Sequence, residues 1–357
     1  MDLTGGLDPS RDLVLAERPQ QGDVRESANM WIFDDQGRFS IPRICVEAIA
    51  SQWDDRGLQV NIAFPSGRAL NGAGAAPAVS PIGTDGRPTV FGAGPLVFEC
   101  LEPFQRWSMA YHGTATDTTV QAQTAGEVDG PDVRVDVDLV ATMVVPPWIQ
   151  GEMSTDAAEK LAAGTTEQLF MGGARYEQLF RCEGTFKVGD DDAMPFTGTG
   201  LRIHRVGVRN TEAFWGHCWQ SAVFPSGKGF GYIGFPPRPD GSPSYVEAYV
   251  FDGDRMLPAA VLQAPWMTEF VPVGGDVSVV FETAAGKVSI EAETSSSTFS
   301  PQGGSLFREW RIDGQKGINA VSFHQGGALY RWDGEETYGM IERSLPADQV
   351  HFGPSNG

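Results

Sequence analysis

The sequence predicts an all-β protein made of two consecutive β units joined by one short helix. Glycine and proline are frequent and spread through the chain, with 44 and 24 among 357 residues. Short runs of Val, Ile, Phe and Tyr lie between these turn formers, which is typical of strands joined by tight turns. A chain of this length can form two cores of ordinary domain size.

The first β unit is expected over residues 26–150, after an irregular arm at 1–25 in which no period is sustained. Its strands are separated by turn sequences such as Asp-Asp-Gln-Gly. We predict them at 28–33, 39–48, 58–64, 89–91, 96–101, 106–112 and 132–144. The stretch 70–87, which is rich in Gly, Ala and Pro, is predicted to be a long loop.

A helix is predicted at 155–163, where strong helix formers follow a Thr or Asp that can cap the N-terminus. We therefore assign 151–175 to a helical connector, 176–345 to the second β unit and 346–357 to a tail. Asp-Gly and Gly-Gly pairs indicate hairpins in the second unit. Its strands are predicted at 185–188, within 198–234, and at 244–251, 277–282, 287–292, 306–312, 328–332 and 339–343.

A four-residue repeat is consistent with two similar halves. Phe-Pro-Ser-Gly at 64–67 recurs at 224–227, and each copy closes a strand that follows a Trp-bearing segment.

The net charge of the chain disfavours polyanionic binding partners. With 46 acidic and 26 basic side chains the net charge is −20, which argues against binding nucleic acid or an anionic membrane surface. No apolar run approaches the roughly 20 residues that span a bilayer, and the N-terminus lacks the pattern of a secretion signal. We expect a cytoplasmic protein with no membrane insertion. Nothing in the sequence fixes its oligomeric state.

The four cysteines are isolated, without a CxxC pair or metal-ligand spacing. They are Cys45, Cys100, Cys182 and Cys218. Scattered single cysteines usually pack as small apolar residues, and we expect reduced thiols. No sequence feature calls for a metal or a cofactor. Ser226 does not lie in a G-x-S-x-G elbow, so the motif of a serine hydrolase is missing. The glycine pairs do not precede a helix, so the motif of a phosphate-binding loop is missing as well.

Several short sequence motifs, taken together, resemble those of a known group of protein families. They are Glu-Ser at 26–27, Pro-Phe-Gln-Arg-Trp at 103–107, His-Gly at 112–113, Tyr-Glu-Gln at 176–178, Gly-Thr-Gly-Leu-Arg-Ile-His at 198–204 and Tyr-Gly-Met-Ile-Glu-Arg at 338–343. Over most of 26–345 the chain resembles the tandem lipocalin-like (calycin) proteins of the AttH-like and carotenoid 1,2-hydratase (hydroxyneurosporene synthase) families. The resemblance implies two antiparallel lipocalin-like β-barrels that enclose an apolar ligand. Some members add water to isoprenoid double bonds or rearrange them.

Residues 198–234 concentrate the side chains best suited to form a site. Alternation along a strand places Arg202 and His204 on one face and Arg205 on the other. Trp215, His217 and Trp219 share one face of the following strand. Two adjacent antiparallel strands would bring His204 and His217 into one cavity beside two indoles. The alternative is that the tryptophans are barrel core and the histidines are structural.

Hydration, dehydration or isomerisation of an alkene needs a Brønsted acid in an apolar site, with aromatic faces to stabilise cationic charge. Burial keeps a carboxyl group protonated, so an acidic residue between bulky neighbours is a candidate. Glu177 is the first candidate and Glu342 the second; Glu26 and Asp34 are weaker ones. For each, a surface carboxylate is the alternative.

We therefore predict a protein that binds an apolar isoprenoid, steroid or polycyclic molecule and performs cofactor-free, acid-assisted hydration, dehydration or isomerisation on it. A non-catalytic carrier of a hydrophobic ligand is the alternative. The predicted catalytic residues are Glu177, His204 and His217. The predicted substrate-binding residues are Arg202, Trp215, Trp219, Tyr176 and Tyr111.

Overall fold

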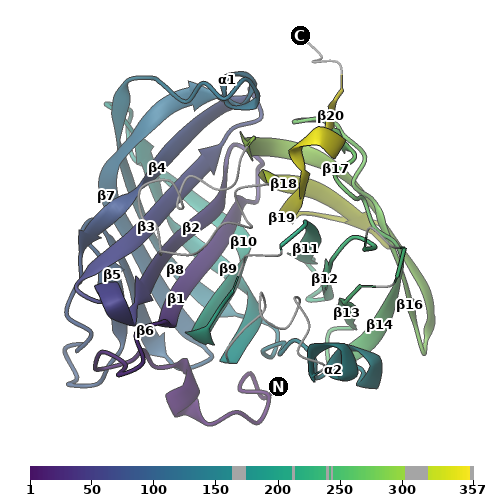
Figure 1. Cartoon of the computed structure of the whole chain (residues 1–357), viewed down its shortest axis with the longest axis horizontal. Coiled ribbons are helices and arrows are strands. Elements are labelled where there is room, and N and C mark those ends of the chain that lie inside the picture. The colour runs from purple at the N-terminus through teal and green to yellow at the C-terminus, as the bar shows by residue number, and fades with distance from the viewer. Residues whose placement is uncertain (163–173, 211–213, 239–240, 243, 302–320, 354–357) are drawn as a thin grey trace.

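The chain folds into two β units that lie side by side, as the computed structural model shows (Figure 1). The structure describes residues 1–162, 174–210, 214–238, 241–242, 244–301 and 321–353. The all-β prediction is confirmed. The predicted helix is present as α2 (Thr155–Ala162), and a short helix that the sequence did not indicate, α1 (Val120–Thr124), follows β7. No helix in the described part of the chain has the length and apolar character needed to cross a bilayer.

The first unit is a ten-stranded antiparallel sheet with the order β4-β3-β2-β1-β10-β9-β8-β7-β6-β5. Its strands are β1 (Val24–Asp34), β2 (Ser40–Ile49), β3 (Asp55–Ala63), β4 (Arg68–Pro77), β5 (Val90–Ala93), β6 (Leu96–Glu102), β7 (Arg106–Thr119), β8 (Asp132–Met143), β9 (Ala174–Val188) and β10 (Met194–Val208). The end of β7 also pairs with β4, at Arg68↔Thr119 and Asn71↔Thr116. This pairing closes eight strands into a ring and leaves β5 and β6 as an extension of β7.

The second unit is a closed barrel with the order β11-β12-β13-β14-β16-β17-β18-β19. Its strands are β11 (His217–Val223), β12 (Gly229–Gly234), β13 (Val246–Phe251), β14 (Met256–Gln263), β16 (Val279–Thr283), β17 (Gly286–Ser300), β18 (Val321–Trp332) and β19 (Glu335–Pro346). The pairing of β11 with β19 closes the barrel. Two tandem antiparallel barrels are therefore confirmed as the architecture.

The predicted boundary between the units needs correction. Strands β9 and β10 cover 174–208 and pair with β8 and with β1, so they belong to the first unit and not to a domain that begins at 176. The helix at 155–162 thus lies within the first unit, in the connection from β8 to β9. The helix resembled a linker in sequence, but the pairing of β10 with β1 is non-local and no local pattern encodes it.

Two predicted irregular segments also contain strands. Part of the predicted loop 70–87 is β4, in which small residues allow close approach: a Cβ at Gly72 would lie 3.2 Å from the carbonyl oxygen of Thr114. In the predicted tail, β20 (His351–Phe352) pairs in parallel with β15 (Glu269–Phe270). The predicted strand at 306–312 lies outside the described residues.

The repeated Phe-Pro-Ser-Gly forms the same turn in both units. The amide of Gly67 donates to the carbonyl of Phe64, and the amide of Gly227 donates to the carbonyl of Phe224. Both glycines have a positive φ, 82° and 92°, which side chains with a Cβ rarely adopt. The turns close the hairpins β3–β4 and β11–β12.

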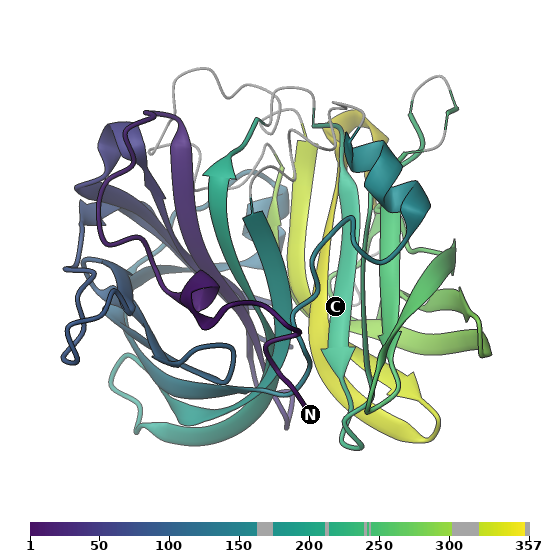
Figure 2. The ribbon, with the colours of Figure 1, turned by 90° about the horizontal axis from the view of Figure 1, so that it is seen from below.

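The two units pack through one sheet face each. Strands β1, β2 and β10 of the first unit face β11, β18 and β19 of the second (Figures 1 and 2). Trp31 on β1 and Trp219 on β11 meet across this interface, edge to face, with ring centroids 4.9 Å apart. Both rings are buried in a cluster that is separate from the core of either barrel. Such aromatic pairs stabilise packing by about 0.5–1.5 kcal/mol beyond area burial.

Candidate functional site between the two barrels

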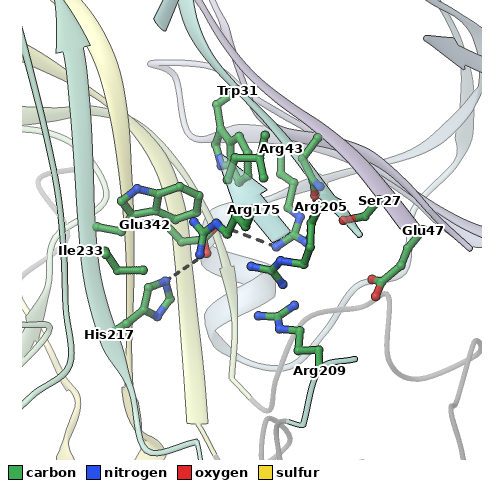
Figure 3. Close-up of a pocket in the computed structure, with 13 residues that line it drawn as sticks. Ser27, Trp31, Arg43, Glu47, Arg175, Arg205, Arg209, His217, Ile233 and Glu342 are labelled. Atoms are coloured by element: carbon green, nitrogen blue, oxygen red, sulfur yellow. Dashed lines mark hydrogen bonds and ion pairs between the residues drawn. The ribbon is translucent and has the colours of Figure 1, made fainter. Parts of the chain in front are cut away.

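A cavity with about 450 Å³ of empty space, partly open to solvent, lies in this interface (Figure 3). The first unit contributes residues from β1, β2, β9 and β10, and the second contributes residues from β11, β12 and β19. Its apolar walls are Trp31, Ile203, Trp219 and Ile233. Its polar lining is Ser27, Asn29, Arg43, Glu47, Arg175, Arg205, Arg209, His217 and Glu342.

The predicted pairing of His204 with His217 is wrong. Strand β10 does not neighbour β11 in a sheet; it pairs with β1 and β9, and only one of its faces points to the second barrel. Ile203 and Arg205 occupy that face and line the cavity. His204 lies on the opposite face, in the first unit, where its Nε2 lies 3.0 Å from Oε1 of Glu26.

Arg202 and Tyr176 also belong to the first unit, where they bind a residue of the N-terminal arm. Asp12 ends the 3₁₀ turn Pro9–Asp12 and is fully buried. Its carboxylate accepts hydrogen bonds from Arg202 at 2.6 Å, from Nε1 of Trp107 at 2.9 Å and from the Tyr176 hydroxyl. A buried carboxylate with these donors holds the arm against the barrel, so these side chains have a structural environment.

Two further predicted ligand contacts lie away from the cavity. The hydroxyl of Tyr111 donates to the carbonyl of Thr114, 2.6 Å away, within the first unit. Trp215 packs on Phe235, and its indole Nε1 donates to the carbonyl of Pro236 at 3.0 Å. Of the predicted substrate-binding residues, Trp219 alone lines the cavity.

His217 is the predicted catalytic residue that the cavity contains. Its Nε2 lies 3.0 Å from Oε1 of Glu342, and its Nδ1 lies 2.5 Å from Oγ of Ser344. Burial opposes ionisation of Glu342, but the hydrogen bond from His217 and the charge of Arg43 outweigh it and lower the pKa of that carboxyl to about 2. An ionised carboxylate only accepts hydrogen bonds, so Nε2 of His217 carries a proton.

Glu177 lies behind the cavity wall and does not line the cavity. Its Oε2 accepts a hydrogen bond from Nε1 of Trp219 at 3.1 Å, and its Oε1 accepts from Arg175 and Gln150. Burial raises the pKa of Glu177, although Arg175 and the hydrogen bonds act in the opposite direction. The carboxyl group therefore orients Trp219 and Arg175, which both face the cavity.

Arginine side chains dominate the polar half of the cavity (Figure 3). Arg43 lies 4.0 Å from Glu342, with its guanidinium 5.7 Å from the Trp31 ring centre. Arg175 pairs with Glu177 and stacks over Trp219 at 5.0 Å. Burial lowers the pKa of Arg205 well below its ordinary value, and the charges of Arg209 and Arg175 lower it further. This half of the cavity thus brings four guanidinium groups together with two carboxylates.

Residues 17–346 match the family described as a domain of unknown function, DUF7064. The chain belongs to the DUF7064 family. A search of curated proteins found no match.

Solved structures match this DUF7064 chain over most of its length. An AttH-like protein from Nitrosomonas europaea aligns with a TM-score of 0.53 and 14% identity, covering 90% of this chain and 91% of that one. The structure of CghA with Sch210972 aligns with a TM-score of 0.50 and 11% identity, covering 92% and 90% of the two chains. At these identities the likeness establishes the fold and no activity. It confirms the resemblance to AttH-like tandem barrels.

A second, larger cavity lies at the interface in this DUF7064 chain, with about 1070 Å³ of empty space when the part open to solvent is included. Its lining is mostly uncharged. Amides are prominent in it: Gln59, Asn61, Asn71, Gln123 and Gln325. Phe299, Phe323, Val128 and Pro301 supply apolar surface.

A directed chain of hydrogen bonds joins the two cavities. The Gln123 amide donates to Asn71, Asn71 donates to Asn61 at 2.8 Å, Asn61 donates to Gln325 at 2.6 Å, and Gln325 donates to Oε2 of Glu342 at 2.6 Å. At the other end, Gln123 accepts from the backbone amide of Phe299 at 2.8 Å. The ionised carboxylate and the backbone N–H together fix the orientation of every amide between them.

Sequence reasoning missed most of the polar lining of the first cavity. Arg205 was placed on the face opposite His204, and that face is the one that lines the site. Arg43 and Glu47 lie in the predicted strand 39–48, and Arg175 is the last residue of the predicted helical connector 151–175. None of them carries a motif, so only the tertiary packing of the barrels identifies them. Within the described residues no three His, Cys, Asp or Glu side chains are grouped closely enough to hold a metal ion.

Proposed function

We propose that the interface cavity binds an unsaturated polycyclic or terpenoid molecule and catalyses a cofactor-free proton-transfer reaction on it, such as isomerisation, hydration or dehydration. The observation that carries the proposal is the 3.0 Å contact between Nε2 of His217 and Glu342 in a cavity whose walls include Trp31 and Trp219. Aromatic and aliphatic walls favour a rigid hydrocarbon skeleton. His217 and Glu342 line the same cavity, so in this proposal they lie next to that skeleton.

In this proposal His217 moves the proton. Glu342 holds Nε2–H of the imidazole and stabilises the imidazolium that forms when Nδ1 accepts a proton. The Ser344 hydroxyl bonds Nδ1, so it must either move away from Nδ1 or pass the proton between Nδ1 and the ligand. The arginines of the cavity would stabilise negative charge that develops on an oxygen of the ligand in the same step.

The test uses isotope incorporation. The purified protein is incubated in D₂O with a panel of terpenoids, steroids and polycyclic phenols, and each compound is recovered and analysed by mass spectrometry. Deuterium on carbon, or the gain or loss of water, is expected in wild type and is expected to fall at least about 100-fold in His217→Gln. His204→Gln is the matched control, because that histidine is equally buried but faces the first barrel.

Two results would contradict the proposal. A compound that binds and always returns unlabelled supports the carrier alternative. Equal loss of turnover in His204→Gln and His217→Gln, with both variants folded by thermal melting, would assign no specific part to His217.

A further inference from the structure

The polar half of the first cavity contains a guanidinium group, that of Arg205, for which the described residues provide no ion-pair contact. Arg205 is buried, its Nε has no hydrogen-bond partner, and no described carboxylate oxygen lies within 4.0 Å of its guanidinium. Leaving a buried charge without a partner is costly, so an anionic group supplied by a ligand would be favourable at this position.

The neighbouring charges make the deficit larger. Four guanidinium groups line the cavity, from Arg43, Arg175, Arg205 and Arg209, against two carboxylates, from Glu47 and Glu342. Arg43 lies 4.0 Å from Glu342, Arg175 pairs with Glu177 behind the cavity wall, and Glu47 accepts from Arg25 at 3.1 Å, so none of these carboxylates is in ion-pair contact with Arg205. Positive charge is thus concentrated here in a chain whose net charge is −20.

We infer that the ligand of this cavity carries an anionic oxygen group, a carboxylate or an acidic enolate, and that Arg205 binds it. The inference rests on the proposed function, which it deepens by naming the polar end of the ligand. The lining is consistent with a molecule whose ring system packs on Trp31 and Trp219 while its anion meets Arg205. Figure 3 shows Trp31 and Arg205 in the same cavity. Guanidinium groups bind carboxylates through paired, charge-assisted hydrogen bonds, which suits this arrangement.

Global electrostatics work against such binding, which makes the test informative. A net charge of −20 repels anions at long range, so a preference for an acid over its neutral ester has to come from local contacts.

The experiment measures affinity by titration calorimetry for three acid and methyl ester pairs: abietic acid, lithocholic acid and 1-pyrenebutyric acid with their esters. In wild type we expect at least one acid to bind about tenfold or more tightly than its ester. In Arg205→Gln we expect that ratio to fall to within about threefold, with ester affinity unchanged. Arg134→Gln, which removes the same charge from an exposed site on β8, is expected to keep the wild-type ratio.

The outcomes separate this inference from the proposed function. Equal affinity for acid and ester would show that the ligand needs no anionic group, but the cavity would still be a site for polycyclic ligands. An acid preference that survives in Arg205→Gln overturns the role of Arg205. Failure of all six compounds to bind wild type counts against the cavity as a site for polycyclic ligands, and therefore against both proposals.

Discussion

Gln325 donates a 2.6 Å hydrogen bond to Glu342, and this contact connects the amide-lined cavity to the arginine-lined cavity. Both residues lie in the second barrel, at paired positions of β18 and β19. The same Gln325 accepts from Asn61 of the first barrel. The contact therefore joins the two cavities and also the two barrels.

The first prediction concerns this contact. Gln325→Glu places a second carboxyl group beside Glu342, and two carboxyl groups this close share a proton, so the pKa of the pair is raised. A raised pKa in the folded state gives stability that is present at low pH and is lost as the pH rises through it. We expect the deficit in melting temperature relative to wild type to be larger at pH 8 than at pH 5. Gln325→Met, which adds no charge, should show a deficit that changes little with pH.

The amide chain also shows what the sequence could and could not predict. Alternation along 132–144 and the Phe-Pro-Ser-Gly segments that end at Gly67 and Gly227 are local patterns. The strand predicted from the alternation is present as β8, and each Phe-Pro-Ser-Gly segment follows the end of a strand as predicted. The pairing of Asn61 with Gln325 spans the two barrels. No local pattern encodes it, because it depends on which sheet faces pack together.

In the candidate site, too, the local features were predictable from the sequence and the non-local ones were not. Alternation correctly separated Arg202 and His204 from Arg205, because faces of a strand are a local property. The face of β10 that lines the site is set by the pairing of β10 with β1, which is many residues away in sequence. This non-local pairing places His204 on the face away from the site, which is why its predicted position was wrong. Asp12, in an arm predicted to be irregular, is buried because donors from distant strands converge on it.

The second prediction concerns Asp12. Asp12→Ala leaves the Arg202 guanidinium buried without its carboxylate, which we expect to cost about 3–5 kcal/mol of unfolding free energy. Asp12→Ala combined with Arg202→Met should cost less than the sum of the single changes, because the unpaired charge is gone. Urea denaturation of the four proteins measures the coupling. Additive effects would mean that the ion pair does not hold the arm. The exposed Asp2→Ala serves as the control.

The third prediction follows from the pKa of Glu342, which lies at about 2 in the folded chain against an ordinary value of 4.5. A lowered pKa gives stability that is present above the ordinary value and is lost as the pH falls toward 2. Glu342→Gln should therefore lower stability by an amount on the order of 3 kcal/mol at pH 7, and the difference from wild type should shrink between pH 4.5 and pH 2.

Melting temperatures of wild type and Glu342→Gln, measured at steps of one pH unit, check this dependence. Glu282→Gln, at an exposed position of β16, is the matched control and should melt like wild type at each pH. A wild-type advantage that stays constant down to pH 2 would show that Glu342 acts through packing and not through its charge.

The last prediction separates stability from ligand binding at two neighbouring arginines. Arg205 is buried among like charges, so Arg205→Met should raise the free energy of unfolding, measured without added ligand, by about 1–2 kcal/mol. The melting temperature should rise accordingly. Arg175→Met should do the opposite, because it leaves Glu177 buried without its ion-pair partner. Differential scanning calorimetry of both variants without ligand measures the two signs. If Arg205→Met destabilises as much as Arg175→Met, then Arg205 is satisfied within the protein and has no need of an anionic ligand. If the signs differ, the chain retains a destabilising arginine in its interface, and a binding role explains why.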